Sequence, residues 1–152
     1  MVTVKTVQHI DAPPSAVWKV VVDPAYTLKL FPDAILQVLD PPGRSALGQK
    51  SRVTMKAGKR RVEVLTEIVD IAEGKRVTAR GMAGGIYKAS ERTVVLEPNN
   101  GGTDVAIRFS YEISTEYLGN LLNPVAVDGL VRDNLRSYVK NLKELSELLP
   151  ME

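Results

Sequence analysis

The segment from Tyr87 to Glu97 alternates like a β-strand and carries an arginine that could bind an anion. Counting back at period two from Leu96 puts Val94 and Arg92 on the same face. If Leu96 faces the core, Arg92 enters the interior, where a guanidinium needs a carboxylate from the protein or a carboxylate or phosphate from a ligand. The protein's own candidates are Glu63, Glu67 and Glu91. If a bulge shifts the register, Arg92 lies on the outer face instead, and both alternatives stay open.

Few other side chains suggest catalytic chemistry. His9 is the only histidine and the chain has no cysteine, so a zinc or thiolate site is not expected. We interpret His9 as a surface residue, and the alternating Glu63 and Glu67 as part of a solvated strand face. The sequence therefore predicts no catalytic residue, no metal and no cofactor. We favour a protein without catalytic activity, and enzymatic activity stays open.

The length and charge of the chain limit the classes of function that it can have. The chain has 152 residues, which suits one domain spanning 1–152, with 20 basic and 18 acidic side chains scattered along it. This balance does not favour nucleic acid as a partner. The N-terminus alternates apolar and polar residues and no segment is long enough to span a bilayer, so we expect a cytoplasmic protein without stable membrane insertion.

The elements that would position these side chains follow from the periodicity. Strands are predicted at 2–10, 35–39, 50–57, 61–71, 76–81, 87–97 and 103–114, and short helices at 15–22 and 26–31. A long helix is predicted from about Leu121 to Leu149, with Asn123 as its N-cap and an apolar stripe that includes Leu135, Tyr138 and Leu142. Its length suits a helix that lies across a wide sheet.

The short connections between strands favour an antiparallel meander with one apolar face, which only the long helix can cover. The predicted fold class is α+β, with a curved seven-stranded antiparallel sheet wrapped around the C-terminal helix. Because such sheets coil, we expect a cavity between the sheet and the helix. The glycine-rich segment 81–85 and the first turns of the helix could flank its mouth as a gate, or the helix could simply fray at its start.

Several short motifs carry a family resemblance. They are Ile10-Asp11-Ala12-Pro13, Val17-Trp18, Asp23-Pro24, Gly48, Leu96-Glu97-Pro98 and Gly102-Thr103-Asp104-Val105. In this order, and with the C-terminal helix, the chain resembles the helix-grip fold of the START/Bet v 1-like (SRPBCC) superfamily, which includes polyketide cyclase-like and coenzyme Q-binding proteins and the CoxG-like proteins associated with carbon monoxide dehydrogenase. The resemblance implies a hydrophobic cavity that binds lipids, isoprenoids, steroids or polyketides. The glycine-rich loop of the plant Bet v 1 proteins has no counterpart in residues 42–48.

We therefore expect binding or transport of a small apolar ligand, such as a fatty acid, isoprenoid or quinone. The predicted cavity wall comprises Trp18, Leu30, Phe31, Val53, Met55, Tyr87, Arg92, Phe109, Tyr111, Val127, Leu130, Val131 and Asn134. One alternative is a polyketide cyclase or aromatase that uses Arg92 and a tyrosine hydroxyl to polarise a carbonyl. Another is an assembly factor for a larger redox enzyme, with a protein partner or a homodimer.

Overall fold

The structure is a computed structural model that describes residues 1–82, 84–115 and 123–149. The strands are β1 (Val2–Ile10), β2 (Ala34–Asp40), β3 (Lys50–Ala57), β4 (Arg60–Ala72), β5 (Arg76–Gly81), β6 (Tyr87–Asn99) and β7 (Gly102–Ile113). The helices are α1 (Pro14–Val22), the 3₁₀ turn η1 (Pro24–Tyr26), α2 (Thr27–Leu30) and α3 (Pro124–Leu148). This order confirms the predicted α+β helix-grip fold.

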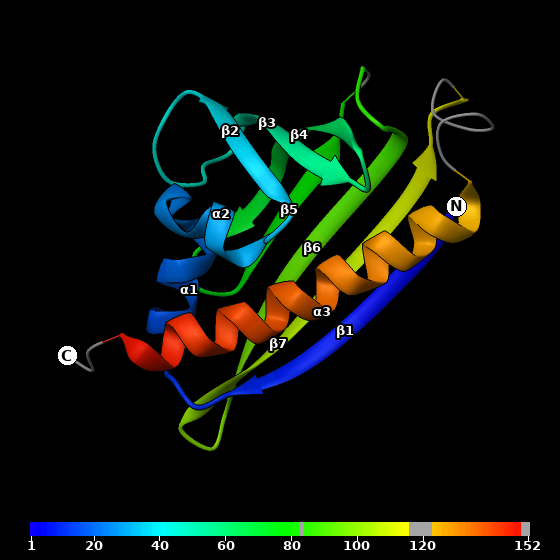
Figure 1. Cartoon of the computed structure of the whole chain (residues 1–152). Helices are drawn as coiled ribbons and strands as arrows, with labels where there is room; N and C mark the ends of the chain where they lie inside the picture. The colour runs from blue at the N-terminus through cyan, green and yellow to red at the C-terminus, as the bar shows by residue number, and fades with distance from the viewer. Residues whose placement is uncertain (83, 116–122, 150–152) are drawn as a thin grey trace.

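The strands form one antiparallel sheet of seven, in the order β1-β7-β6-β5-β4-β3-β2. Consecutive strands from β2 to β7 are neighbours, as their short turns require, while β1 pairs with β7 and leaves β2 at the opposite edge. In Figure 1, α3 runs diagonally across the sheet alongside β1, and α1 and α2 lie near its C-terminal half.

The long helix begins where the sequence predicts. The Asn123 side chain accepts a hydrogen bond from the Ala126 amide at 2.8 Å, and Pro124 occupies the first turn. Residues 121 and 122, which the sequence also assigned to this helix, lie outside the described residues. The predicted stripe is confirmed, because Leu135, Tyr138 and Leu142 are all buried.

The core lies between α3, α1 and the β1-β7-β6 side of the sheet. The alternation predicted for β7 is confirmed: Val105, Ile107 and Tyr111 are buried, whereas Arg108 is exposed. The opposite edge is different, since none of the seven residues of β2 is fully buried and Ala57 alone is buried in β3. The curled sheet is therefore tightly packed on one side of α3 and loosely covered on the other.

Candidate functional site

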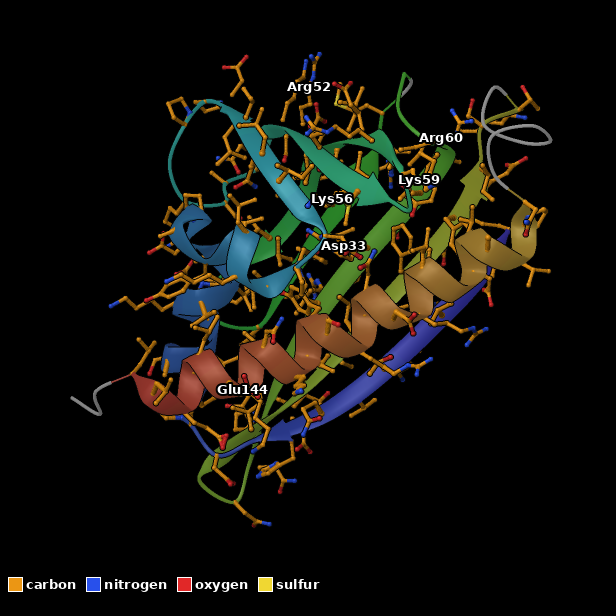
Figure 2. The ribbon with its side chains drawn as sticks, in the orientation of Figure 1. Asp33, Arg52, Lys56, Lys59, Arg60 and Glu144 are labelled. Atoms are coloured by element: carbon orange, nitrogen blue, oxygen red, sulfur yellow. The ribbon has the colours of Figure 1, made fainter. Side chains whose placement is uncertain are left out.

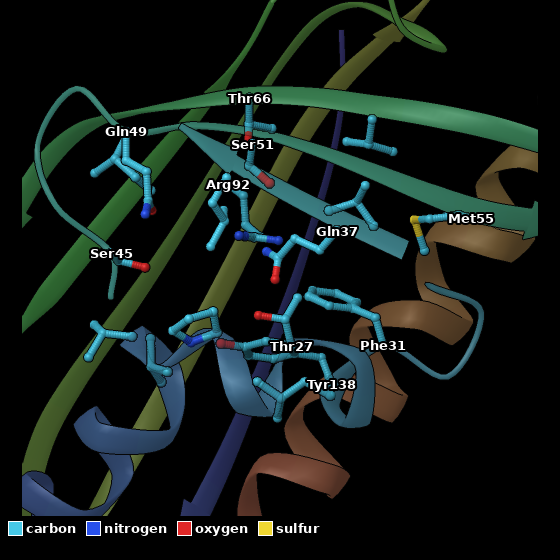
Figure 3. Close-up of a pocket in the computed structure, with 18 of the residues that line it drawn as sticks. Thr27, Phe31, Gln37, Ser45, Gln49, Ser51, Met55, Thr66, Arg92 and Tyr138 are labelled. Atoms are coloured by element: carbon cyan, nitrogen blue, oxygen red, sulfur yellow. The ribbon is translucent and has the colours of Figure 1, made fainter. Parts of the chain in front are cut away.

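A cavity of about 110 Å³ lies on the loosely packed side of the molecule. Its floor is the inner face of β3 and β4, its walls come from α2 and β2, and the β2–β3 loop closes one end. Arg92 reaches into it from β6, and Tyr138 is the residue of α3 that lines it. Figure 3 shows these side chains converging on one space.

Part of the predicted wall is present in this cavity. The predicted residues that line it are Leu30, Phe31, Val53, Met55 and Arg92. The phenyl ring of Phe31 stacks against Tyr138 with ring centroids 5.0 Å apart, and the Arg92 guanidinium lies 5.3 Å from the centroid of Phe31. The Arg92 guanidinium is the single cation of the described cavity lining, and it lies over one face of the Phe31 ring.

The predicted aromatic wall lies elsewhere. Tyr87, Phe109 and Tyr111 pack together beside the first half of α3, with centroid distances of 5.2 to 5.6 Å. The Tyr111 hydroxyl donates to an Asp128 carboxylate oxygen at 3.1 Å, and burial raises the pKa of Tyr111 to about 12. These rings fill the space between helix and sheet that the sequence analysis assigned to the ligand.

The remaining predicted wall residues also lie outside the cavity lining. Val127 and Val131 are buried in the main core, and Leu130 packs on a smaller cluster around Val62. Trp18 is buried too, and its indole N–H donates to Glu73 at 3.0 Å. Asn134 is partly buried on α3 but does not line the cavity. The physical reason is that the first half of α3 packs directly on the sheet, and the sheet lifts away only towards β2.

The orientation of Arg92 settles the alternative that the sequence left open. Val94 and Leu96 are buried, and Arg92 pairs in register with Phe109 and Ala79, which both face inward. A bulge does exist in β6, but it lies between Tyr87 and Ala89, before Arg92 is reached. The count from Leu96 therefore holds as far as Arg92. At the bulge itself, Lys88 lies on the outer face, where its ammonium group is 3.7 Å from a Glu112 carboxylate oxygen.

Most of the polar lining was missed by the sequence analysis. These residues are Thr27, Gln37, Ser45, Gln49, Ser51, Thr66 and Tyr138. A signal for Ser51 existed, because it shares a strand face with Val53 and Met55 at period two. Polar side chains in strands are usually solvated, so nothing in the pattern marked them as interior.

The loop at the end of the cavity is anchored from inside. The Gln49 side-chain amide lies within hydrogen-bonding distance of three loop carbonyls, those of Pro41 (2.9 Å), Gly43 (3.0 Å) and Arg44 (3.3 Å). From outside, Arg44 donates to both oxygens of Glu73, at 3.1 and 2.7 Å. This bidentate pair holds the pKa of Glu73 below its usual value. The β2–β3 loop is therefore held by Gln49 from inside and by Glu73 of the β4–β5 turn from outside.

The described residues of the glycine-rich segment, which are 81, 82, 84 and 85, do not line the cavity. The Met82 amide donates to the Leu65 carbonyl at 2.8 Å and the Ile86 amide to the Glu63 carbonyl at 2.9 Å. Gly85 passes so close to β4 that an added Cβ would lie 2.7 Å from the Glu63 carbonyl oxygen. The predicted gate is therefore wrong for its described residues, because backbone pairing holds them against β4.

The titratable groups of the cavity lining are a guanidinium and a phenol. Burial lowers the pKa of Arg92 and raises that of Tyr138 to about 12. Both groups still carry their protons at neutral pH, so both can donate hydrogen bonds to a bound molecule. Within the described part of the chain, no group of three or more acidic or histidine side chains is placed to hold a metal ion.

This fold and cavity define a helix-grip protein of the START/Bet v 1-like superfamily. Residues 1–147 match the family model described as polyketide cyclase/dehydrase and lipid transport, so the chain belongs to that family. A comparison with curated proteins gave no match. No helix among the described residues has the length and apolar character needed to cross a membrane.

Solved structures show the same fold. TTHA0849 from Thermus thermophilus is 24% identical with a TM-score of 0.75, covering 96% of this chain and 97% of its own. The ZhuI aromatase/cyclase from Streptomyces sp. R1128 is 14% identical with a TM-score of 0.76, covering 96% and 93%. A START superfamily protein from Mycobacterium smegmatis is 16% identical with a TM-score of 0.74, covering 97% and 99%.

Proposed function

We propose that the protein binds one small organic molecule with an apolar body in the cavity between α2, β2 and the β3–β4 floor. The supporting observation is the cavity itself, which apolar side chains such as Leu30, Phe31, Val53 and Met55 line while the far half of the molecule is filled. Burial of apolar ligand surface contributes roughly 25 cal/mol per Å², so such a wall supplies affinity for many shapes.

The volume of the cavity limits the size of the ligand that it can hold. A cavity of about 110 Å³ is smaller than the roughly 300 to 1,000 Å³ of typical ligand pockets. It suits a compact ring or a short chain, and a full-length fatty acid or a quinone tail would require β2 or the loop to move outward. We therefore favour a compact ligand over the long-chain lipids of the sequence-based expectation.

Native purification followed by denaturing mass spectrometry, with thermal unfolding against a panel of short acids, alcohols and single-ring aromatics, tests this proposal. A bound panel member should raise the free energy of unfolding by about 2.7 kcal/mol at a hundred times its Kd. Val53→Trp, which fills the cavity, should remove the effect. Val38→Trp is the matched control, since Val38 is 54% exposed on the neighbouring strand. No co-purified molecule and no shift with any panel member would refute the proposal.

A second candidate function is cyclisation of a polyketone, favoured by one observation: Arg92 and Tyr138 present two proton donors to one cavity. Such donors can polarise a carbonyl group. Turnover of a poly-β-ketone thioester should then fall by about 10²-fold or more in Tyr138→Phe, the loss typical of one missing oxyanion donor. An unchanged rate in this variant would exclude this role for Tyr138.

A further inference from the structure

The cavity holds polar side chains that the protein itself does not satisfy. Gln49 is used by the loop, but Gln37, Thr27, Arg92 and Tyr138 make no side-chain hydrogen bond with the described residues. In Figure 3 the Arg92 guanidinium, the Gln37 amide and the Thr27 hydroxyl are directed into the same space. Thr27, Gln37 and Arg92 are each partly buried, so a molecule that enters the cavity and accepts hydrogen bonds can meet all three donors.

Among the residues that the structure describes, no carboxylate forms an ion pair with Arg92. The three glutamates that could have supplied one lie on the outer face of the sheet, which keeps them away from the cavity. Glu63 faces Arg52 at 4.0 Å, and Glu91 faces Arg80 at 3.4 Å. Glu67 alternates with the cavity-lining Thr66 and Ile68, and therefore also points outward. Figure 2 shows Arg52 directed away from the molecule on this side.

The number of charges restricts the ligand. The described lining contains one cation and no carboxylate, so a single negative charge would be balanced and a second would not. A planar guanidinium matches the two oxygens of a carboxylate, which it binds through two parallel hydrogen bonds. The neighbouring Phe31 and Tyr138 rings offer a flat apolar surface next to that position.

We propose, on the basis of the proposed binding function, that the cavity selects a compact monocarboxylate whose carboxylate pairs with Arg92 and whose apolar body lies against Phe31 and the β3–β4 floor. Gln37 and Thr27 then donate to the remaining carboxylate lone pairs. A neutral ligand of the same shape would leave the guanidinium unpaired, so the cavity would discriminate by charge as well as by size.

Isothermal titration with benzoate and benzamide tests this inference, because the two probes share one shape and differ in charge. The wild-type protein should bind the acid at least about tenfold more tightly than the amide, as expected for charge-assisted hydrogen bonds. Arg92→Gln should abolish that preference, so that the acid and the amide bind with affinities within about threefold of each other. Arg80→Gln, which removes a paired arginine on the outer face, should keep the preference.

The outcomes separate this inference from the proposed function. Equal binding of acid and amide by the wild-type protein, or an unchanged preference in Arg92→Gln, would overturn charge selection and leave ligand binding intact. Tighter binding of phenyl phosphate than of the acid would overturn the choice of a monocarboxylate. Failure of the acid, the amide and the wider panel to bind would overturn both proposals.

Discussion

Gln37 and Gln49 line the same cavity but differ in what holds them. Gln49 is 4% exposed and serves three backbone carbonyls, whereas the Gln37 amide has no partner among the described residues. Gln49→Ala would leave those loop carbonyls without their donor, so we expect it to lower the free energy of unfolding by about 1 to 3 kcal/mol. Gln37→Ala should stay within about 0.5 kcal/mol of the wild type. Urea unfolding of both variants measures the difference, and equal losses would contradict it.

The lone histidine gives a second prediction at this scale. His9 Nδ1 lies 2.6 Å from Asp104 and Nε2 lies 3.3 Å from Asp11. The hydrogen bond to Asp104 raises the pKa of His9 above its ordinary value of 6.5. Because the folded state holds the proton more tightly, the stability from this group is complete below pH 6.5 and is lost as the pH rises through the raised pKa.

The NMR titration of the single His9 ring should therefore give a midpoint above 6.5, and Asp104→Asn should move it back towards that value. Unfolding free energies measured from about pH 5.5 to about pH 8.5, roughly one unit below to two units above the ordinary pKa, should decline with pH in the wild type and decline less in Asp104→Asn. A His9 midpoint at or below 6.5 would contradict the predicted pairing. His9 lies at the end of β1 and does not line the cavity, in agreement with its interpretation as a surface residue.

The residue scale also shows where sequence reasoning stops. Arg92 could be placed on one of two faces from the alternation alone, and the deciding fact was the position of a bulge before Ala89. A bulge inserts a single residue and shifts the alternation, and the sequence pattern alone does not show where it lies. The polar lining was missed for a related reason: Ser51 and Thr66 have the pattern of solvated strand residues, and only the sheet's curl turns them towards a cavity.

At the scale of elements, alanine substitutions at two glycines are predicted to change the free energy of unfolding in opposite directions. Gly129 lies inside α3, and an added Cβ would meet no atom within 4 Å, so close packing does not explain this glycine. Gly129→Ala should raise the free energy of unfolding by about 0.5 to 1 kcal/mol through helix propensity. Gly102 begins β7, where an added Cβ would lie 2.6 Å from the Ile10 carbonyl oxygen. Gly102→Ala should therefore lower the free energy of unfolding. Chemical denaturation measures both variants, and a change of the same sign in both, or the opposite sign in each, would refute this account.

The existence and order of elements were predictable because each has its own signal. The α3 stripe repeats at helical spacing, and Asn123 with Pro124 marks its start. Turn residues separate the strands, and their short spacing permits antiparallel pairing only. The depth at which α3 lies on the sheet has no such signal, because it depends on how Tyr87, Phe109 and Tyr111 fill the space beneath it. That is why the cavity was expected along the first half of the helix and lies beyond it.

At the scale of the whole molecule, one half of the protein is tightly packed and the other half contains the cavity. The fully buried side chains, including Val105, Ile107 and Leu142, lie between α3 and the β1-β7-β6 side. The cavity lies on the opposite side, under an edge strand that has no fully buried residue. On the outer face, Arg80 pairs with Glu91 and Lys88 with Glu112, which confirms the expected solvated surface there. A protein partner or a homodimer stays a prediction.

This division predicts a gradient of local stability across the sheet, from β1 and β7 to β2 and β3. Segments with few buried apolar contacts open locally, so amides of β2, β3 and their loop should exchange with deuterium faster than those of β1 and β7. A ligand that requires the closed cavity, such as benzoate at a hundred times its Kd, should slow exchange in β2, β3 and α2 by up to about 100-fold. Exchange in β7 should slow by a similar factor where it proceeds through global unfolding, because the ligand also raises the free energy of global unfolding. Val53→Trp should show the same protection without ligand, since the indole occupies the space that the ligand would fill. Uniform exchange across the sheet in the ligand-free protein would contradict the predicted gradient, and ligand protection confined to β7 and the first half of α3 would place the binding site in the tightly packed half of the molecule.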